Sequence, residues 1–338
     1  MRSIALLSVI LLNLGAARPL PVTATQTPPQ SPPRVDHILL WGRSIDEVTS
    51  IMAVKLGFQI RPGHDPSGVA NRYVRLADRG FVELLGITRP NAEMDPGSQA
   101  DQVSLRGGAG ARSFGIYSST VEQLRSALMA KGFGVTSVFS APTAKASATT
   151  SAGTTTPVWW LFAFEKQPLS SSLFFIDYSP SYAMPTSVAD DRIVRTHPNG
   201  ATALSAVWLL SSNADADRDS LAKMGFGGAR PVRISRVAAR GYCIPVGPNY
   251  VLALQPDGSG ISAETLSRGG AQVLGISIAV TDLGRAQRWV ERGYEQKLDS
   301  YDGALGPSFL APTQNDLGLF VEFHAATKVT AESCGDSK

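Results

Sequence analysis

Residues 35–58 read VDHILLWGRSIDEVTSIMAVKLGF. The apolar run from Val35 to Leu40 has the length and composition of a short strand. A helical pattern follows it and ends at Gly57-Phe58. Glycine supplies the left-handed residue that a helix C-terminus favours, and the aromatic residue after it begins a new strand. This stretch therefore predicts a strand, a helix and a further strand in succession.

The same pattern occurs four times, which makes the chain an internal repeat. Strand-like segments open the units at residues 35–40, 114–117, 204–209 and 273–278. Each is followed by a helical pattern that ends at a glycine and an aromatic residue, and strand-like segments at 81–85, 175–178, 250–254 and 320–323 close the units. Unit two is longer because it holds a low-complexity insert at residues 141–156, rich in alanine, serine and threonine.

The first unit resembles the glyoxalase-like branch of the vicinal oxygen chelate (VOC) superfamily. The segments that carry the resemblance are VDHILL at 35–40, KLGF at 55–58, PGH at 62–64 with Gly68 and Asn71, and FVELLG at 81–86. In that superfamily two units pair so that their curled sheets form an open barrel with a divalent metal in its mouth. The resemblance implies an α+β fold of four βαβββ units that form two open-barrel (glyoxalase/bleomycin-resistance-like) domains.

The expected organisation follows from these units. Residues 35–190 hold units one and two with the insert, residues 197–326 hold units three and four, and residues 327–338 form a polar tail. Before them lie an expected signal peptide at 1–24 and a proline-rich lead at 25–34.

The N-terminal segment predicts that the protein is exported. Arg2 precedes an apolar run, from Ile4 to Ala17, that is shorter than a membrane-spanning helix needs. Cleavage after Ala24 or Ala17 satisfies the small-residue rule, and the alternative is an uncleaved N-terminal anchor. We therefore expect an exported protein, periplasmic or secreted, with no membrane span in the mature chain.

Composition narrows the possible partners. The 338 residues include 31 lysines and arginines against 28 aspartates and glutamates, with no basic run, so we expect no nucleic-acid partner. The two cysteines, Cys243 and Cys334, lack the spacing of a zinc site. They could pair in an oxidising compartment, and the sequence leaves that open. Any metal must therefore be bound by histidines and carboxylates.

The strongest candidates for a site are His37 and Glu83. A carboxylate in a strand that is apolar on both faces needs a cation or a hydrogen-bond partner. Burying an unpaired charge costs on the order of several kcal/mol. The resemblance places both residues on metal-ligand positions. The alternative is a hydrogen-bonded core histidine and a glutamate paired with Arg43, Arg72 or Arg75.

A third ligand depends on which units pair. The positions equivalent to His37 cannot coordinate a metal: Gly115, Ala206 and Gly275. The positions equivalent to Glu83 are expected to be Asp177, Leu252 and Glu322. If units one and two pair, the expected set is His37, Glu83 and Asp177. If units one and four pair, Glu322 replaces Asp177 and His324 could join it.

Three further residues are possible members of the site. His197 begins the segment His-Pro-Asn-Gly, which could deliver an imidazole to the first unit or form a turn. His64 lies in a segment with loop composition, where a solvated histidine is the ordinary expectation. The resemblance permits His64 and Asn71 to line the mouth of a substrate pocket.

One histidine with several carboxylates favours a hard or borderline ion, such as Mn, Mg, Ni, Fe(II) or Zn, acting as a Lewis acid. Glu83 is the expected general base. The resemblance implies a divalent-metal-dependent lyase or isomerase acting on a small oxygenated molecule. The alternatives are a metal-poor, resistance-type protein that binds a small molecule without turnover, and an extradiol-type dioxygenase. Oligomeric state is left open.

Overall fold

The structure is a computed structural model that describes residues 31–65, 68–140, 159–178, 192–193, 195–326 and Cys334. The expected signal peptide at 1–24, the insert at 141–156 and all of the tail at 327–338 except Cys334 lie outside the described residues. Among the helices in the described ranges, none is long and apolar enough to cross a membrane.

Unit one follows the order that its sequence predicts. It comprises β1 (Arg34–Trp41), α1 (Ile45–Ser50) continued by the π-helix η1 (Ile51–Lys55), β2 (Arg61–Pro62), β3 (Val69–Arg75) and β4 (Phe81–Ile87). The Ser44 hydroxyl accepts a hydrogen bond from the backbone N–H of Glu47 and so caps α1. Gly57 has a φ of +78°, which is the left-handed conformation expected after the helix.

The other units repeat this order, with helix α2 (Pro96–Leu105) joining units one and two. Unit two contains β5 (Gly110–Tyr117), α3 (Val121–Ala130), β6 (Phe139–Ser140), β7 (Trp159–Ala163) and β8 (Ser172–Tyr178). Unit three contains β9 (Ala201–Leu210), α5 (Ala214–Met224), β10 (Arg230–Ile234), the short helix η2 (Ser235–Val237), β11 (Ala239–Val246) and β12 (Asn249–Pro256). After α6 (Ile261–Gly269), unit four contains β13 (Gln272–Val280), α7 (Leu283–Tyr294), β14 (Ser300–Gly303), β15 (Gly306–Ala311), α8 (Gln314–Leu317) and β16 (Phe320–Ala325).

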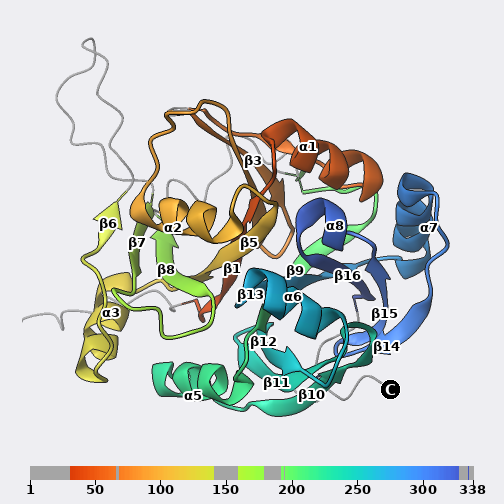
Figure 1. Cartoon of the computed structure of the whole chain (residues 1–338). Coiled ribbons are helices and arrows are strands. Elements are labelled where there is room, and N and C mark those ends of the chain that lie inside the picture. The colour runs from red at the N-terminus through yellow and green to blue at the C-terminus, as the bar shows by residue number, and fades with distance from the viewer. Residues whose placement is uncertain are drawn as a thin grey trace, which may run out of the picture. The chain divides into compact units, whose positions relative to one another are not determined.

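The first strands of the units decide which units pair. β1 pairs antiparallel with β5, so units one and two share a curled sheet, and β9 pairs antiparallel with β13 in the same way (Figure 1). A single bridge, Val273 to Ala111, joins the two pairs of units into one sheet that is curled and open, not closed into a barrel. The expectation of an α+β fold built from βαβββ units is confirmed.

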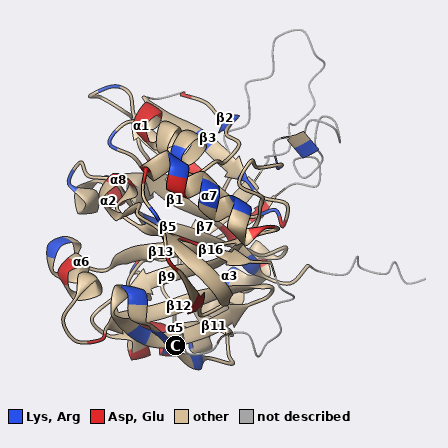
Figure 2. Ribbon diagram, turned by 90° about the vertical axis from the view of Figure 1, so that its right-hand side faces the viewer, with Lys and Arg blue, Asp and Glu red and all other residues tan. Residues whose placement is uncertain are grey.

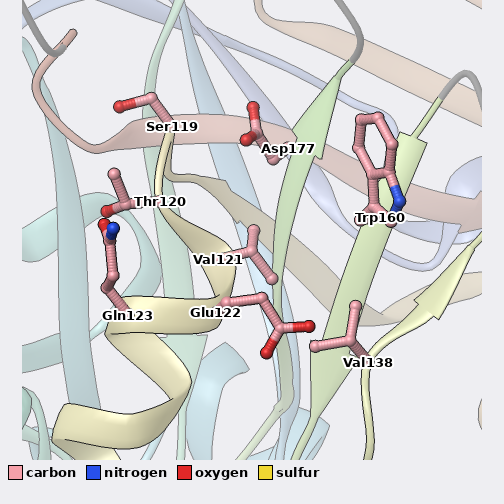
Figure 3. Close-up of a pocket in the computed structure, with 8 residues that line it drawn as sticks. All are labelled: Ser119, Thr120, Val121, Glu122, Gln123, Val138, Trp160 and Asp177. Atoms are coloured by element: carbon pink, nitrogen blue, oxygen red, sulfur yellow. The ribbon is translucent and has the colours of Figure 1, made fainter. Parts of the chain in front are cut away.

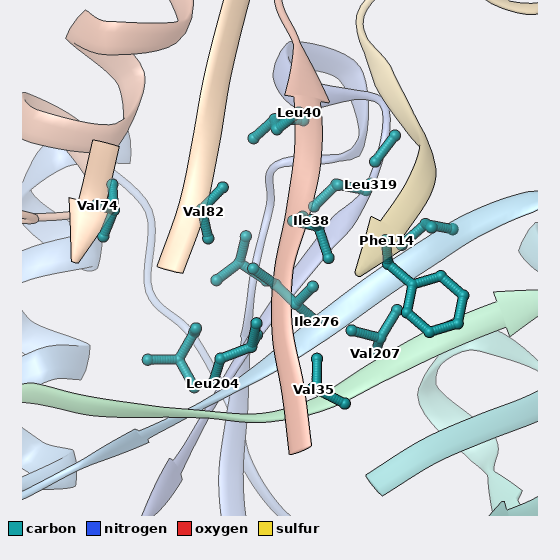
Figure 4. Close-up of a cluster of buried hydrophobic side chains, with 14 of the residues drawn as sticks. Val35, Ile38, Leu40, Val74, Val82, Phe114, Leu204, Val207, Ile276 and Leu319 are labelled. Carbon is teal, nitrogen blue, oxygen red and sulfur yellow. The ribbon is translucent and has the colours of Figure 1, made fainter. Parts of the chain in front are cut away.

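The core lies between the sheets and the helices. Figure 4 shows Val35, Ile38 and Leu40 of β1 packed with apolar residues of the neighbouring strands. A β-bulge between Val35 and His37 puts Val35 on the core side together with Ile38. His37 therefore does not share a face with Val35, as plain strand alternation would have it.

The concave face of units three and four is filled by side chains. A second apolar cluster there includes Trp208, Leu252, Leu305 and Phe320. Cys243 of β11 forms a disulfide with Cys334, and both half-cystines belong to this cluster. This disulfide settles the pairing that the sequence left open.

Charged residues of both signs are interspersed over the described elements (Figure 2). Helix α5 is an example, because Arg218 forms ion pairs with Asp215 and Asp219 on the same helix. Such exposed pairs contribute little to stability, because water screens them.

Candidate functional site

Adjacent strands of unit one bring His37 and Glu83 together. β1 and β4 run parallel, His37 lies opposite Phe81, and Glu83 lies two residues further along β4 on the same face. The His37 Nε2 atom is 3.8 Å from Oε2 of Glu83. The side chains are 6% and 17% exposed, so both are nearly buried and Glu83 is the more accessible of the two.

The imidazole of His37 is held from several sides. Its Nδ1 lies 2.8 Å from Oδ2 of Asp36, an oxygen that also accepts a 2.6 Å hydrogen bond from the Tyr178 hydroxyl. Phe81 stacks on the imidazole at 4.2 Å between ring centroids, and Phe174 meets it edge-on at 5.1 Å. A carboxylate accepts hydrogen bonds, so the contact with Asp36 is a hydrogen bond when Nδ1 carries a proton, and Nε2 is the ring nitrogen on the side of Glu83.

The carboxyl group of Glu83 is oriented by an amide. Asn71 Nδ2 donates a 3.0 Å hydrogen bond to Oε1, which leaves Oε2 on the side of His37. Burial raises the pKa of Glu83 above its ordinary value, although His37 and the Asn71 hydrogen bond oppose this shift. Arg43 and Arg72 have other partners, since Arg43 pairs with Glu47 and Arg72 donates to a backbone carbonyl.

His64 reaches this region through its backbone. Its N–H donates a 2.6 Å hydrogen bond to Oδ1 of Asn71, whereas the imidazole itself is exposed. Asn71 thus links the His64 loop to Glu83. The structure places both predicted pocket residues at the edge of the site.

The structure does not bring Asp177 to His37. In β8 the residue opposite Gly115 is Phe174, just as Phe81 is opposite His37. The residue equivalent to Glu83 is therefore Ile176, and Asp177 is one position further and points to the other face of the strand. Figure 3 shows Asp177 beside Trp160 and the start of α3, where these residues line a cavity of about 290 Å³.

The position equivalent to His37 in unit two is sterically closed as well. A Cβ at residue 115 would lie 2.6 Å from the Phe174 ring, so this ring occupies the space that a ligand side chain there would need. Unit two consequently contributes no metal ligand from either strand position.

Glu322 and His324 are buried within units three and four and do not reach His37. Glu322 accepts hydrogen bonds from Ser277 at 2.7 Å and Tyr301 at 2.6 Å, and burial raises its pKa. His324 bonds Ser205 through Nε2 and the carbonyl of Ala325 through Nδ1. Burial lowers the pKa of His324 to about 4.

His197 holds segments of the chain together and is not part of the site. Its Nδ1 accepts a hydrogen bond from the backbone N–H of Gln59, and its Nε2 donates to the carbonyl of Arg75. Burial lowers its pKa. Both ring nitrogens are therefore hydrogen-bonded to the backbone of unit one, and His197 has a structural role.

Several residues of the site were not predicted from the sequence. Asp36 precedes His37 in the sequence and Tyr178 follows Asp177. The contact between Asp36 and Tyr178 depends on the bulge and on how the units pair.

Helix α2 covers one end of the concave face, where Trp41, Leu85 and Leu105 form a small apolar cluster. On its inner side, the Asp101 carboxylate accepts hydrogen bonds from Ser113 and Trp41.

We expect Asp101 to make stability depend on pH. Burial raises its pKa to about 6, from 3.8, so the folded state favours the protonated acid. Its contribution is fully present below pH 3.8 and is lost as the pH rises through about 6, a change of about 2–3 kcal/mol. The measurement is urea unfolding of wild type and Asp101→Asn between about pH 4 and pH 7. A difference between the two proteins that stays constant over this range contradicts the expectation.

The residues present fit a cation held by two protein atoms. His37 Nε2 and Glu83 Oε2, 3.8 Å apart, are too far from each other for a hydrogen bond, and these are the two side chains that would hold a divalent cation. In the described part of the chain, no group of three or more His, Cys, Asp or Glu side chains could hold a metal ion. A cation here would depend on water or substrate oxygens for its other ligands.

Comparison with known proteins identifies one family and several solved structures with a similar fold. The profile of a family described as "Glyoxalase-like domain" matches residues 35–225, which is more than half of the 338 residues. The match covers units one and two and the first strand and helix of unit three. No curated protein matches the sequence.

Three solved structures share the fold over most of the chain. A mutant of 4-hydroxymandelate synthase from Streptomyces coelicolor is 12% identical with a TM-score of 0.58, covering 89% of this chain and 98% of the other. A hypothetical protein from Staphylococcus aureus is 14% identical with a TM-score of 0.53, covering 87% and 99%. A catechol 2,3-dioxygenase is 11% identical with a TM-score of 0.54, covering 88% of each chain. At these identities the likeness shows the fold alone.

Proposed function

The chain belongs to the glyoxalase-like domain family of the VOC superfamily, and from this premise we propose that it is a lyase or isomerase. Its substrate is a small molecule with two adjacent oxygen atoms, such as an α-hydroxycarbonyl compound. The observation that carries the proposal is the 3.8 Å approach of the His37 Nε2 atom to Oε2 of Glu83 on the adjacent strands β1 and β4.

Glu83 is the base that removes a proton from carbon. A carboxylate whose pKa is raised towards the working pH is a stronger base than an exposed one, and burial raises this pKa. Asn71 holds Oε1, so that Oε2 is the oxygen that receives the proton. Return of the proton to the adjacent carbonyl carbon, with the hydroxyl proton passing by way of His37 Nε2 to the former carbonyl oxygen, gives isomerisation. Loss of a leaving group with its bonding electrons from the carbon on the other side of the deprotonated carbon gives a lyase reaction.

His37 binds the oxygen next to the reacting carbon. Its Nε2 lone pair accepts a hydrogen bond from a substrate hydroxyl, because Nδ1 carries the ring proton. Phe81 and Phe174 exclude water from two sides of the imidazole. A divalent cation held by His37 and Glu83 would replace this hydrogen bond at Nε2 and would supply Lewis-acid stabilisation of negative charge on the substrate oxygens.

Units three and four support the fold without a site of their own in this proposal. Their equivalent of Glu83 is Glu322, which accepts hydrogen bonds from Ser277 and Tyr301, and apolar side chains fill the face around it.

We also propose that the protein is exported, as the N-terminal segment suggests. The Cys243–Cys334 disulfide supports export, because disulfides persist mainly in oxidising compartments.

The test is solvent exchange at carbon, which requires no knowledge of the final product. Purified mature protein is incubated in D₂O with a panel of α-hydroxyketones, α-hydroxyaldehydes and matched simple ketones. Proton NMR then follows loss of the signal from the carbon next to the carbonyl, with and without added Mn²⁺. We expect exchange with compounds that carry two adjacent oxygens and none with the simple ketones. Binding of these compounds without exchange would contradict the enzyme proposal and favour a small-molecule binding protein.

A further inference from the structure

The bulge in β1 makes Asp36 and His37 act on the same side of the sheet. In a regular strand two consecutive residues point to opposite faces. The register shift between Val35 and His37 breaks this alternation, and Asp36 bonds the ring of its own neighbour at 2.8 Å. The same shift recurs in β9 and β13, at Ser205 and Leu274, so it belongs to the repeated architecture.

Asp36 is nearly inaccessible to solvent and has partners on both carboxylate oxygens. Oδ2 receives hydrogen bonds from His37 Nδ1 and the Tyr178 hydroxyl, and an Arg34 guanidinium nitrogen lies 3.5 Å from Oδ1. Because the Tyr178 hydroxyl donates to Oδ2, the 2.8 Å contact of the same oxygen with the imidazole is a hydrogen bond in which Nδ1 is the donor.

Tyr178 comes from unit two, at the end of β8, and crosses to unit one. It lies on the same strand face as Phe174 and Ile176. Unit two has no ligand at either strand position, because Gly115 and Ile176 cannot coordinate. Its polar contribution to the histidine is therefore this hydroxyl, which reaches His37 through Asp36.

We propose that Asp36 and Tyr178 are positioning residues that fix His37 as the Nδ1–H tautomer and direct the Nε2 lone pair at Glu83. The inference rests on the proposed function of the same site. A carboxylate behind a histidine orients the ring and raises the basicity of its free nitrogen, and losing such a partner commonly weakens activity or metal binding about 10–100-fold.

The experiment reads the tautomer directly. Protein with ¹⁵N-labelled histidine is studied by NMR at one pH above about 8, where an ordinary imidazole is neutral. The two ring nitrogens of His37 are assigned with His37→Ala. We expect wild type to show a protonated Nδ1 and a bare Nε2, and Asp36→Ala to shift His37 towards the Nε2–H form. Tyr178→Phe should give an intermediate spectrum with its fold intact.

Tyr117→Phe is the matched control, because this tyrosine stacks on Tyr178 at 6.4 Å between centroids. It should leave the His37 spectrum and the exchange rate unchanged. Asp36→Asn and Tyr178→Phe should lower the maximal exchange rate about 10-fold or more, with little change in KM. An unchanged His37 tautomer in both Asp36→Ala and Tyr178→Phe overturns the positioning role. Absence of exchange in wild type overturns the proposed function instead, and the imidazole spectrum still decides the positioning role.

Discussion

Glu83→Gln is expected to lower the rate of solvent exchange at the substrate carbon by about 10²–10⁴-fold. Glutamine keeps the shape of the side chain and its acceptor oxygen for Asn71, but it cannot take a proton from carbon. The loss should fall on the maximal rate more than on KM, since the base acts mainly in the transition state. The measurement is the NMR exchange assay with the best substrate of the panel, at saturating concentration.

Asp177→Asn is the matched control for this variant. It also removes one carboxylate from a final strand, but Asp177 lies on the helix side of β8, beside Trp160. We expect its rate of solvent exchange at the substrate carbon to stay within about twofold of the wild-type rate. A Glu83→Gln protein as active as wild type, or an Asp177→Asn protein as impaired as Glu83→Gln, contradicts the assignment of the base.

Loss of the Cys243–Cys334 disulfide is expected to reduce the free energy of unfolding by about 3–5 kcal/mol. The bond joins residues 91 apart in sequence, so the unfolded chain gains much freedom when it is broken. Its two half-cystines are also buried in the apolar cluster of units three and four. Urea unfolding of the purified protein, with and without a reducing agent, measures the difference.

The double variant Cys243→Ala with Cys334→Ala separates the cross-link from the effects of the reducing agent. It should be destabilised to a similar extent and should not respond to reduction. The folded variant should still catalyse exchange, because the disulfide is in units three and four. A change below about 1 kcal/mol on reduction would contradict a stabilising cross-link.

Much of the fold followed from residue patterns. Four repeats were visible because each unit ends its helix at a glycine and an aromatic residue, and this spacing recurs along the chain. The pairing of units one with two and three with four was not decided by the sequence. It depends on long-range contacts between β1 and β5 and between β9 and β13, for which a single sequence has no local signal.

The candidate site was predicted in part. His37 and Glu83 share an apolar context that draws attention to them, and the structure brings them within 3.8 Å. Asp177 was misplaced because the sequence has two adjacent phenylalanines, Phe174 and Phe175, and either could align with Phe81. Strand register shows that Phe174 is the equivalent residue, and an error of one position moves a side chain to the opposite face.

The remaining histidines illustrate what a sequence cannot show. His197 and His324 are buried with both ring nitrogens bonded, so neither is available to the site. Asp36 directly precedes His37 in the sequence, but its contact with the His37 ring depends on a β-bulge. Bulges change which residues share a face without leaving a reliable mark in composition.

A double-mutant cycle between His37 and Glu83, measured on the solvent-exchange rate, tests most directly whether the two residues form one site. We predict that His37→Ala and Glu83→Gln each cause a large loss and that the double variant is little slower than the slower single variant, because each residue needs the other. Glu322→Gln, the equivalent change in unit four, should exchange substrate within about twofold of wild type. Fully multiplicative losses in the cycle, or a Glu322→Gln protein as slow as Glu83→Gln, would contradict a single site on units one and two.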